Sequence, residues 1–74
     1  MKIFIICSNY HTKVGMSLVG IEGVAVYKQS SLNDEVQKAI NNPGIGILLI
    51  EEHLLKNVNI PIRNVPIVVA IPKI

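Results

Sequence analysis

Four short segments of the chain are apolar on consecutive residues rather than on alternate ones. This pattern is typical of strands that are buried on both faces of a sheet, because neither face of such a strand meets water. The segments that the pattern predicts as strands are residues 3–6, 24–27, 45–50 and 66–71.

The segment between the second and third predicted strands has the clearest helical pattern. Its apolar residues recur at i, i+4, i+7 and i+8, which predicts one stripe facing the sheet, and they are Leu32, Val36, Ala39 and Ile40. Ser31 is expected to cap the helix, with Asp34 and Glu35 in a first turn where the helix dipole favours acids. Residues 42–44, Asn-Pro-Gly, are expected to end it because proline cannot continue the hydrogen-bond ladder.

The segment between the first two predicted strands carries weaker helix signals. Thr12 is expected to cap this helix, and Val14, Leu18 and Ile21 stand at i, i+4 and i+7 along it. Gly20 is placed to take the left-handed conformation that commonly ends a helix. The pattern therefore predicts a short helix with one apolar stripe.

The segment between the last two predicted strands, residues 51–64, has helix signals only at its start. Residues 51–55 are expected to form about two turns. The residues that stop this helix are Asn57, Asn59 and Pro61, and the remainder is expected to be loop.

Strands that alternate with helical segments of this length indicate a parallel sheet, because right-handed crossovers need about a dozen residues each. The predicted fold class is therefore α/β: a four-stranded parallel sheet with flanking helices, in a Rossmann-like or flavodoxin-like three-layer arrangement. No repeat or linker interrupts the pattern, so residues 1–74 are expected to form a single α/β domain.

The length of 74 residues leaves this domain little reserve of core. A folded chain of this size buries only about 60% of the surface that its extended form exposes. Cys7 is the one cysteine, so no intrachain disulfide can form, and no Cys/His grouping has the spacing of a zinc site. Burial against a partner, either another protein or further copies in a homo-oligomer, is the expected additional support.

The hydrophobic runs are too short to cross a bilayer, which takes roughly 20 residues, and the first residues lack a signal-peptide core. The chain is therefore expected to be cytoplasmic, without direct membrane insertion. The formal charge of +2 comes from seven basic residues, none adjacent to another, and the chain has only three aromatic residues. Nucleic-acid binding is not expected, because it needs a basic surface and rings on which bases stack.

Cys7 closes the first predicted strand before a polar loop, where a helix N-terminus and His11 would lower the pKa of a thiol. This placement resembles the phosphocysteine carriers of sugar phosphotransferase systems, and such a IIB-like carrier is the alternative function. The residues that follow, Asn9 to His11, are bulkier than a phosphate-cradling loop prefers. A buried cysteine that packs as a small hydrophobe is the favoured interpretation.

Ligands and partners of open parallel sheets meet the loops beyond the carboxyl ends of the strands. The residues predicted there as partner contacts are Asn9, His11, Thr12, Glu51, Glu52 and His53. The adjacent carboxylates would diverge by about 100° around a helix axis, so they are not expected to converge on a metal ion. The glycine pattern of dinucleotide binding is missing after the first strand. No catalytic residue, cofactor or metal is expected.

Three blocks of sequence, in order, resemble the F-type stalk component of the V/A-type rotary ATP synthases (V-ATPases). Residues 12–21 resemble that family's run of threonine, leucine and glycines after the first strand. Residues 44–52 are similar to its third strand, where a glycine among aliphatic residues leads to an acidic residue. Residues 66–72 resemble its closing strand, which is bracketed by prolines.

The resemblance implies a four-stranded parallel sheet and a non-catalytic place on the central rotor stalk. The implied partners are the D-type protein of the rotor shaft, with its long helical hairpin, and other stalk and head components of the ATPase. The implied location is cytoplasmic, peripheral to the membrane through that complex. The family normally continues past the closing proline into a helical tail, so the resemblance is to a short or C-terminally truncated member.

Overall fold

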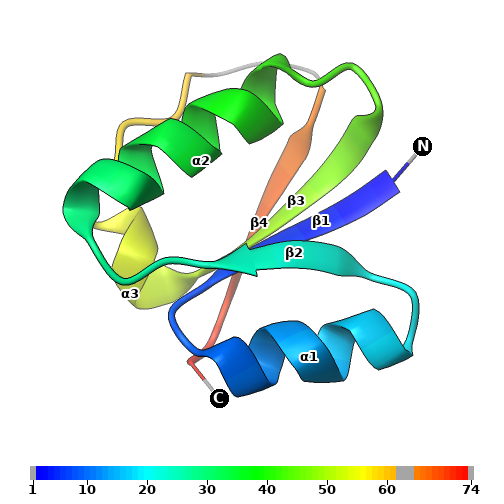
Figure 1. Cartoon of the computed structure of the whole chain (residues 1–74). Helices are drawn as coiled ribbons and strands as arrows, with labels where there is room; N and C mark the ends of the chain where they lie inside the picture. Colours follow the sequence, from blue (N-terminus) through cyan, green and yellow to red (C-terminus); the bar gives the residue numbers. More distant parts are fainter. Residues whose placement is uncertain (1, 62–64, 74) are drawn as a thin grey trace.

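The computed structural model of the chain describes residues 2–61 and 65–73. Its elements in chain order are β1 (Lys2–Cys7), α1 (Tyr10–Leu18), β2 (Glu22–Ala25), α2 (Gln29–Asn41), β3 (Ile45–Glu51), α3 (Glu52–Leu55) and β4 (Ile67–Ile71). The strands form one four-stranded sheet in the order β2-β1-β3-β4, and every neighbouring pair is parallel (Figure 1). The predicted α/β class with an all-parallel sheet is confirmed.

The order of the strands decides which face each helix covers. The chain moves from β1 to β2 in one direction along the sheet, and from β2 to β3 and on to β4 in the other direction. Right-handed crossovers in opposite directions put their helices on opposite faces. Accordingly α1 packs against β1 and β2 on one face, and α2 and α3 lie on the other (Figure 1).

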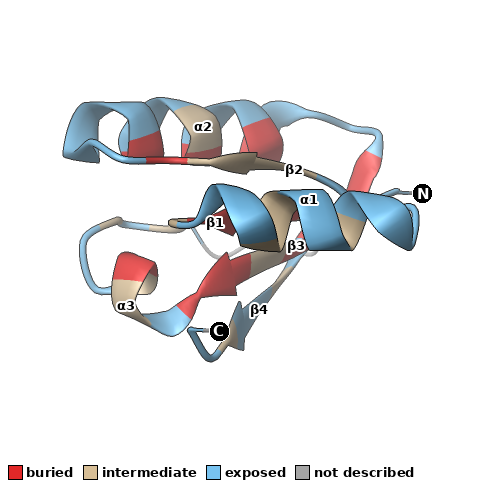
Figure 2. Cartoon of the chain, turned by 60° about the horizontal axis from the view of Figure 1, so that its bottom comes forward, coloured by how far each residue is buried: buried red, intermediate tan, exposed pale blue. Residues whose placement is uncertain are grey.

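The hydrophobic core lies between the sheet and α2. The four residues of the predicted stripe are all buried, and they pack with Ile6, Leu48 and Ile50 in one cluster. Leu54 of α3 closes the end of this cluster. Figure 2 shows the burial concentrated on this side of the sheet, whereas α1 is exposed along most of its length.

The start of α2 differs from the prediction. The helix begins at Gln29 after Lys28, whose side chain makes no capping hydrogen bond, and Ser31 lies inside the helix. Asp34 and Glu35 consequently fall outside the first turn. The helix starts early because the Leu32 amide already donates to the Lys28 carbonyl, at 3.0 Å.

The end of α2 agrees with the sequence. The helix stops at Asn41, and the side chain of Asn42 accepts a hydrogen bond from the Gly44 amide at 2.9 Å. This Asx-type turn fixes the approach to β3.

The N-terminal cap of α1 is Asn9. The prediction that Thr12 caps this helix was wrong. The Asn9 side-chain oxygen accepts from the His11 amide at 2.7 Å, so the helix starts at Tyr10 and Thr12 lies within it. Gly20 has φ +85°, the left-handed conformation that the sequence predicted. Ile21 follows this turn and is not part of the helix.

The second strand lies earlier than predicted, at Glu22–Ala25 rather than at residues 24–27. Val26 is buried in the core cluster but lies beyond the strand, and Tyr27 is 72% exposed. The apolar run at residues 24–27 therefore consists of the end of a strand, followed by the buried loop residue Val26 and the exposed Tyr27. The third helix is a single turn, Glu52–Leu55, because Glu51 still belongs to β3.

Gly23 and Gly15 offer opposite outcomes for the same substitution. A Cβ on Gly23 would overlap the side chain of Ile5 and lie 2.6 Å from the Ile5 carbonyl oxygen. We expect Gly23→Ala to lower the free energy of unfolding by about 2–3 kcal/mol, because a paired strand backbone cannot move aside freely. Gly15, inside α1, has no atom within 4 Å of a built Cβ, and Gly15→Ala should raise stability by about 0.5–1 kcal/mol.

Urea denaturation of both variants beside the unaltered chain measures these changes directly. Equal effects of the two substitutions would show that the close approach of β1 and β2 does not limit position 23.

Candidate partner-contact site

The carboxyl ends of all four strands meet at one edge of the sheet, since the strands are parallel. The segments at this edge are the β1–α1 loop, the β2–α2 loop, the β3–α3 junction and the residues after β4 (Figure 1). Parallel α/β sheets bind ligands and partners here, at the point where connections leave in opposite directions. In this chain that point lies between β1 and β3.

A buried carboxylate ties two of these segments together. Glu51 is only 1% exposed, and its Oε1 accepts hydrogen bonds from the amide of Ser8 and from the Ser8 hydroxyl, the latter at 2.8 Å. Its Oε2 is buried without a hydrogen-bond partner among the described residues. The contact holds the β1–α1 loop against the β3–α3 junction.

The six predicted contact residues have different surroundings. Asn9 and His11 are exposed and lie together at the start of α1, where Asn9 caps the helix. Thr12 is half-buried in the first turn of the same helix. Asn9, His11 and Thr12 thus form one group, on the β1 side of the edge.

On the β3 side, Glu52 is exposed while its neighbour Glu51 is buried, so the two carboxylates do not converge. His53 is half-buried, and its Nδ1 has no hydrogen-bond partner among the described residues. The Ser8–Glu51 bonds are the direct link between the two sides.

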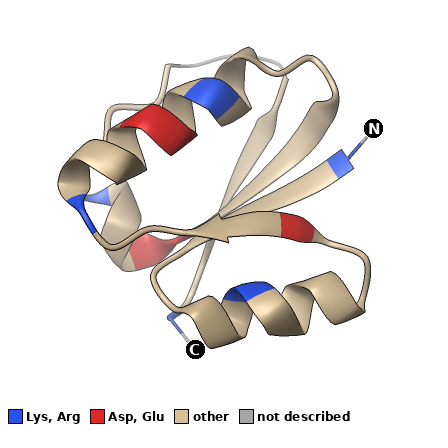
Figure 3. Cartoon of the chain, viewed as in Figure 1, with Lys and Arg blue, Asp and Glu red and all other residues tan. Residues whose placement is uncertain are grey.

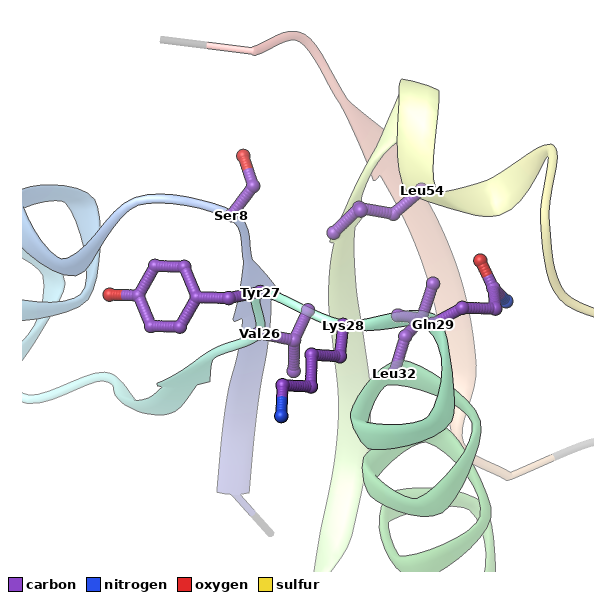
Figure 4. Close-up of a pocket in the computed structure, with 7 residues that line it drawn as sticks. All are labelled: Ser8, Val26, Tyr27, Lys28, Gln29, Leu32 and Leu54. Carbon is purple, nitrogen blue, oxygen red and sulfur yellow. The ribbon is translucent and has the colours of Figure 1, made fainter.

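A cleft of about 320 Å³ opens beside Ser8 at this edge (Figure 4). The sequence analysis did not identify most of its lining, which consists of Ser8, Val26, Tyr27, Lys28, Gln29, Leu32 and Leu54. In Figure 4 the ring of Tyr27 points away from Leu54 and Gln29 on the opposite wall. Ending the second strand at Ala25 would have moved Tyr27 into the loop and revealed it as a candidate.

Cys7 has the surroundings of a packed thiol. Its side chain is fully buried, and Sγ lies 3.4 Å from the Asn9 carbonyl oxygen and 3.5 Å from that of Val24. Burial raises the pKa of the Cys7 thiol, and the nearby charge of Glu51 raises it further. A nucleophilic cysteine needs the opposite, an accessible sulfur with a lowered pKa.

The charged residues in the described part of the chain are dispersed over separate elements (Figure 3). Among residues 2–61 and 65–73, no group of three or more His, Cys, Asp or Glu side chains could hold a metal ion. None of the helices within those ranges is long and apolar enough to span a membrane. The side chains exposed at this edge include the polar Asn9, His11 and Glu52 and the aromatic Tyr27.

Replacing Glu51 tests the hydrogen bonds between Glu51 and Ser8 that connect the two sides of this edge. Glu51→Ala leaves the Ser8 amide and hydroxyl without their buried acceptor, and we expect it to cost about 2–3 kcal/mol of unfolding free energy. Glu52→Ala, a neighbouring carboxylate on the surface, should change it by less than about 0.5 kcal/mol. Chemical denaturation of both variants checks the difference, and equal small losses would contradict a structural role for Glu51.

The raised pKa of Cys7 predicts a loss of stability at alkaline pH. The folded chain holds the thiol proton more tightly than the unfolded chain, so this contribution is complete below the ordinary value of 9.0 and is lost as pH rises through the folded value. Above about pH 9 the unaltered chain should lose stability more steeply than Cys7→Ala, which lacks the titrating group. Urea midpoints across this range measure the slopes, and parallel curves would refute the expectation.

Comparison with known proteins is consistent with these features. Residues 3–74 match the family described as ATP synthase (F/14-kDa) subunit, almost the whole chain. No individual curated protein matches the chain significantly. The match covers the strands and helices of the fold except for Lys2, the first residue of β1, and agrees with the three blocks of sequence described above. The chain therefore belongs to the family of the ATP synthase (F/14-kDa) subunit, the F-type component of the V/A-type rotary ATPases.

Proposed function

We propose that this chain is a non-catalytic component of the central stalk of a V/A-type rotary ATPase. In this role it binds the D-type protein of the rotor shaft and helps to couple ATP hydrolysis or synthesis to ion transport. The observation that carries the proposal is the family match over residues 3–74. The chain would act in the cytoplasm, peripheral to the membrane through the complex.

The surroundings of the polar residues support a binding role rather than catalysis. The thiol of Cys7 is inaccessible, and the carboxylate of Glu51 is occupied by Ser8. Both Glu52 and His11 lie on the surface, away from the buried setting that aligns a general base. The same exposure leaves them open to another protein.

The carboxyl edge is the surface that we assign to the shaft. Tyr27 places an exposed ring beside the cleft, and Lys28 adds a positive charge to the same wall (Figure 4). An aromatic side chain next to a cleft is a common anchor for a partner side chain, because it offers a large contact area at small entropic cost. Asn9, His11 and Glu52 extend this surface with polar groups, while Glu51 acts indirectly by holding the loop of Ser8.

Binding to the purified D-type shaft protein, measured by calorimetry, tests the proposal. Tyr27→Ala should weaken binding at least about tenfold, because it removes the aromatic anchor. Glu52→Ala should have a smaller effect that diminishes at high salt, as expected for a charge at the rim of an interface. Both side chains are exposed, so the fold should remain intact.

Gln37→Ala is the matched control, since Gln37 is an exposed residue of α2 away from the carboxyl edge. Absence of binding by the unaltered chain would refute the shaft assignment. Binding that is unchanged in Tyr27→Ala would refute the assignment of this edge while leaving the partner in place.

A further inference from the structure

One half of the sheet is apolar and uncovered on the face that carries α1. In the parallel register, Ile3, Ile47 and Ile67 form one row across β1, β3 and β4, and Leu49 and Val69 lie in the next row. Ile67 is 58% exposed and Val69 40% exposed. We call the β3 and β4 members of these rows, Ile47, Leu49, Ile67 and Val69, the open half-sheet.

No element in the described part of the chain covers the open half-sheet. Helix α1 packs on β2 and β1, whereas α2 and α3 lie on the opposite face (Figure 1). Val68, which alternates with the exposed residues of β4, faces that opposite side and packs against the core. Strands of parallel sheets are normally covered on both faces, so this surface calls for an additional layer.

Helix α1 has an apolar stripe that is also uncovered. Tyr10, Val14 and Leu18 stand at i, i+4 and i+8, which places them on one face of the helix. All three are exposed, and Leu18 is 82% exposed. The partly buried residues of the helix are Thr12, Lys13 and Met16, so the stripe points away from the sheet, toward the same side of the molecule as the open half-sheet.

We propose that these two surfaces pair in a symmetric dimer of this chain. The α1 stripe of each copy lies on the open half-sheet of the other, around a two-fold axis. Two strands at a spacing of about 4.8 Å make a strip about 10 Å wide, which matches the roughly 10 Å diameter of one helix. A second copy is thus the occupant for which this chain itself supplies both complementary parts.

The exposed apolar area is of the size that such a dimer needs. The three residues of the stripe, with Ile67, Val69 and the bordering Ile3, are between 39% and 82% exposed, which corresponds to roughly 400–500 Å² of apolar surface. A standard interface buries about 800 Å² per partner, and in homodimers about 65% of it is apolar. The remainder would come from the polar rim around α1.

The composition of the surface also favours a second copy. Neither the α1 stripe nor the open half-sheet contains a charged residue, whereas interfaces that recruit charged partners carry complementary charges. The dimer surface adjoins the carboxyl edge at Tyr10, but Leu18 and Val69, where the dimer is tested below, are not among the residues assigned to the rotor shaft.

Sedimentation equilibrium of the purified chain, over about two decades of concentration, tests the dimer. The expected mass rises from that of the 8.1 kDa chain to twice that value. Leu18→Glu, at an exposed site where the fold tolerates a charge, should raise the dissociation constant at least about tenfold, because the interface would bury an unpaired carboxylate. Gln37→Glu adds the same charge on the exposed face of α2 and should leave the constant unchanged.

A disulfide between copies tests the geometry. Mixing a Leu18→Cys chain with a Val69→Cys chain under mild oxidation should give the mixed disulfide dimer, while Gln37→Cys with Val69→Cys should not. The native Cys7 is buried and does not compete.

Two results would overturn the proposal. One is a monomeric mass at every concentration. This result would overturn the dimer even if the monomer bound another component of the ATPase through Leu18. The other is a dimer whose dissociation constant is unchanged by Leu18→Glu and whose copies are not cross-linked by the Leu18→Cys and Val69→Cys pair.

Discussion

A parallel sheet has two faces to cover, and this requirement governs the rest of the molecule. Its three connections cross from strand to strand, and their directions assign two helices to one face and a single short helix to the other. The well-covered face holds the core, where the stripe of α2 meets β1 and β3. The other face is only half covered by the described elements, which leaves the chain an apolar surface in place of a complete third layer.

The close pairing of β1 and β2 beneath α1 depends on a small residue in β2, because a Cβ on Gly23 would overlap Ile5. Gly23 and Ala25 lie opposite Ile5 and Cys7, so the strand beneath the helix presents little side chain. At the carboxyl edge the restraint is polar, because Glu51 holds Ser8 and thereby fixes the loop that leads into α1. Rigid placement of this loop gives the edge a defined shape without involving the exposed residues that a partner would meet.

The fold was predictable because its signals are collective. Consecutive apolar residues at four places and the helical spacing of α2 were sufficient to predict the sheet and the main helix. The caps were harder, since Asn9 and Thr12 are both good caps and only the three-dimensional path of the loop selects Asn9. The shift of β2 had a similar cause, because the buried Val26 has the same apolar character whether it lies in a strand or in a loop.

The candidate site was less predictable than the fold. Sequence placed Glu51 at the correct edge of the sheet, but its burial depends on Ser8, which lies far away in the chain. Tyr27 was missed because the end of β2 was placed two residues too late. Pairwise contacts between distant segments leave no periodic signal in a single sequence.

The strand order also has a consequence for the way in which the chain folds. Strand β1 is synthesised first, yet it lies in the interior of the sheet between β2 and β3. Its residues Phe4 to Ile6 pair with β2 on one side and with β3 on the other, so its hydrogen bonds are complete only after most of the chain has left the ribosome. Sheets with such distant pairings fold slowly, and a nascent chain of this protein must keep the apolar residues of β1 from aggregating until Ile50 is available.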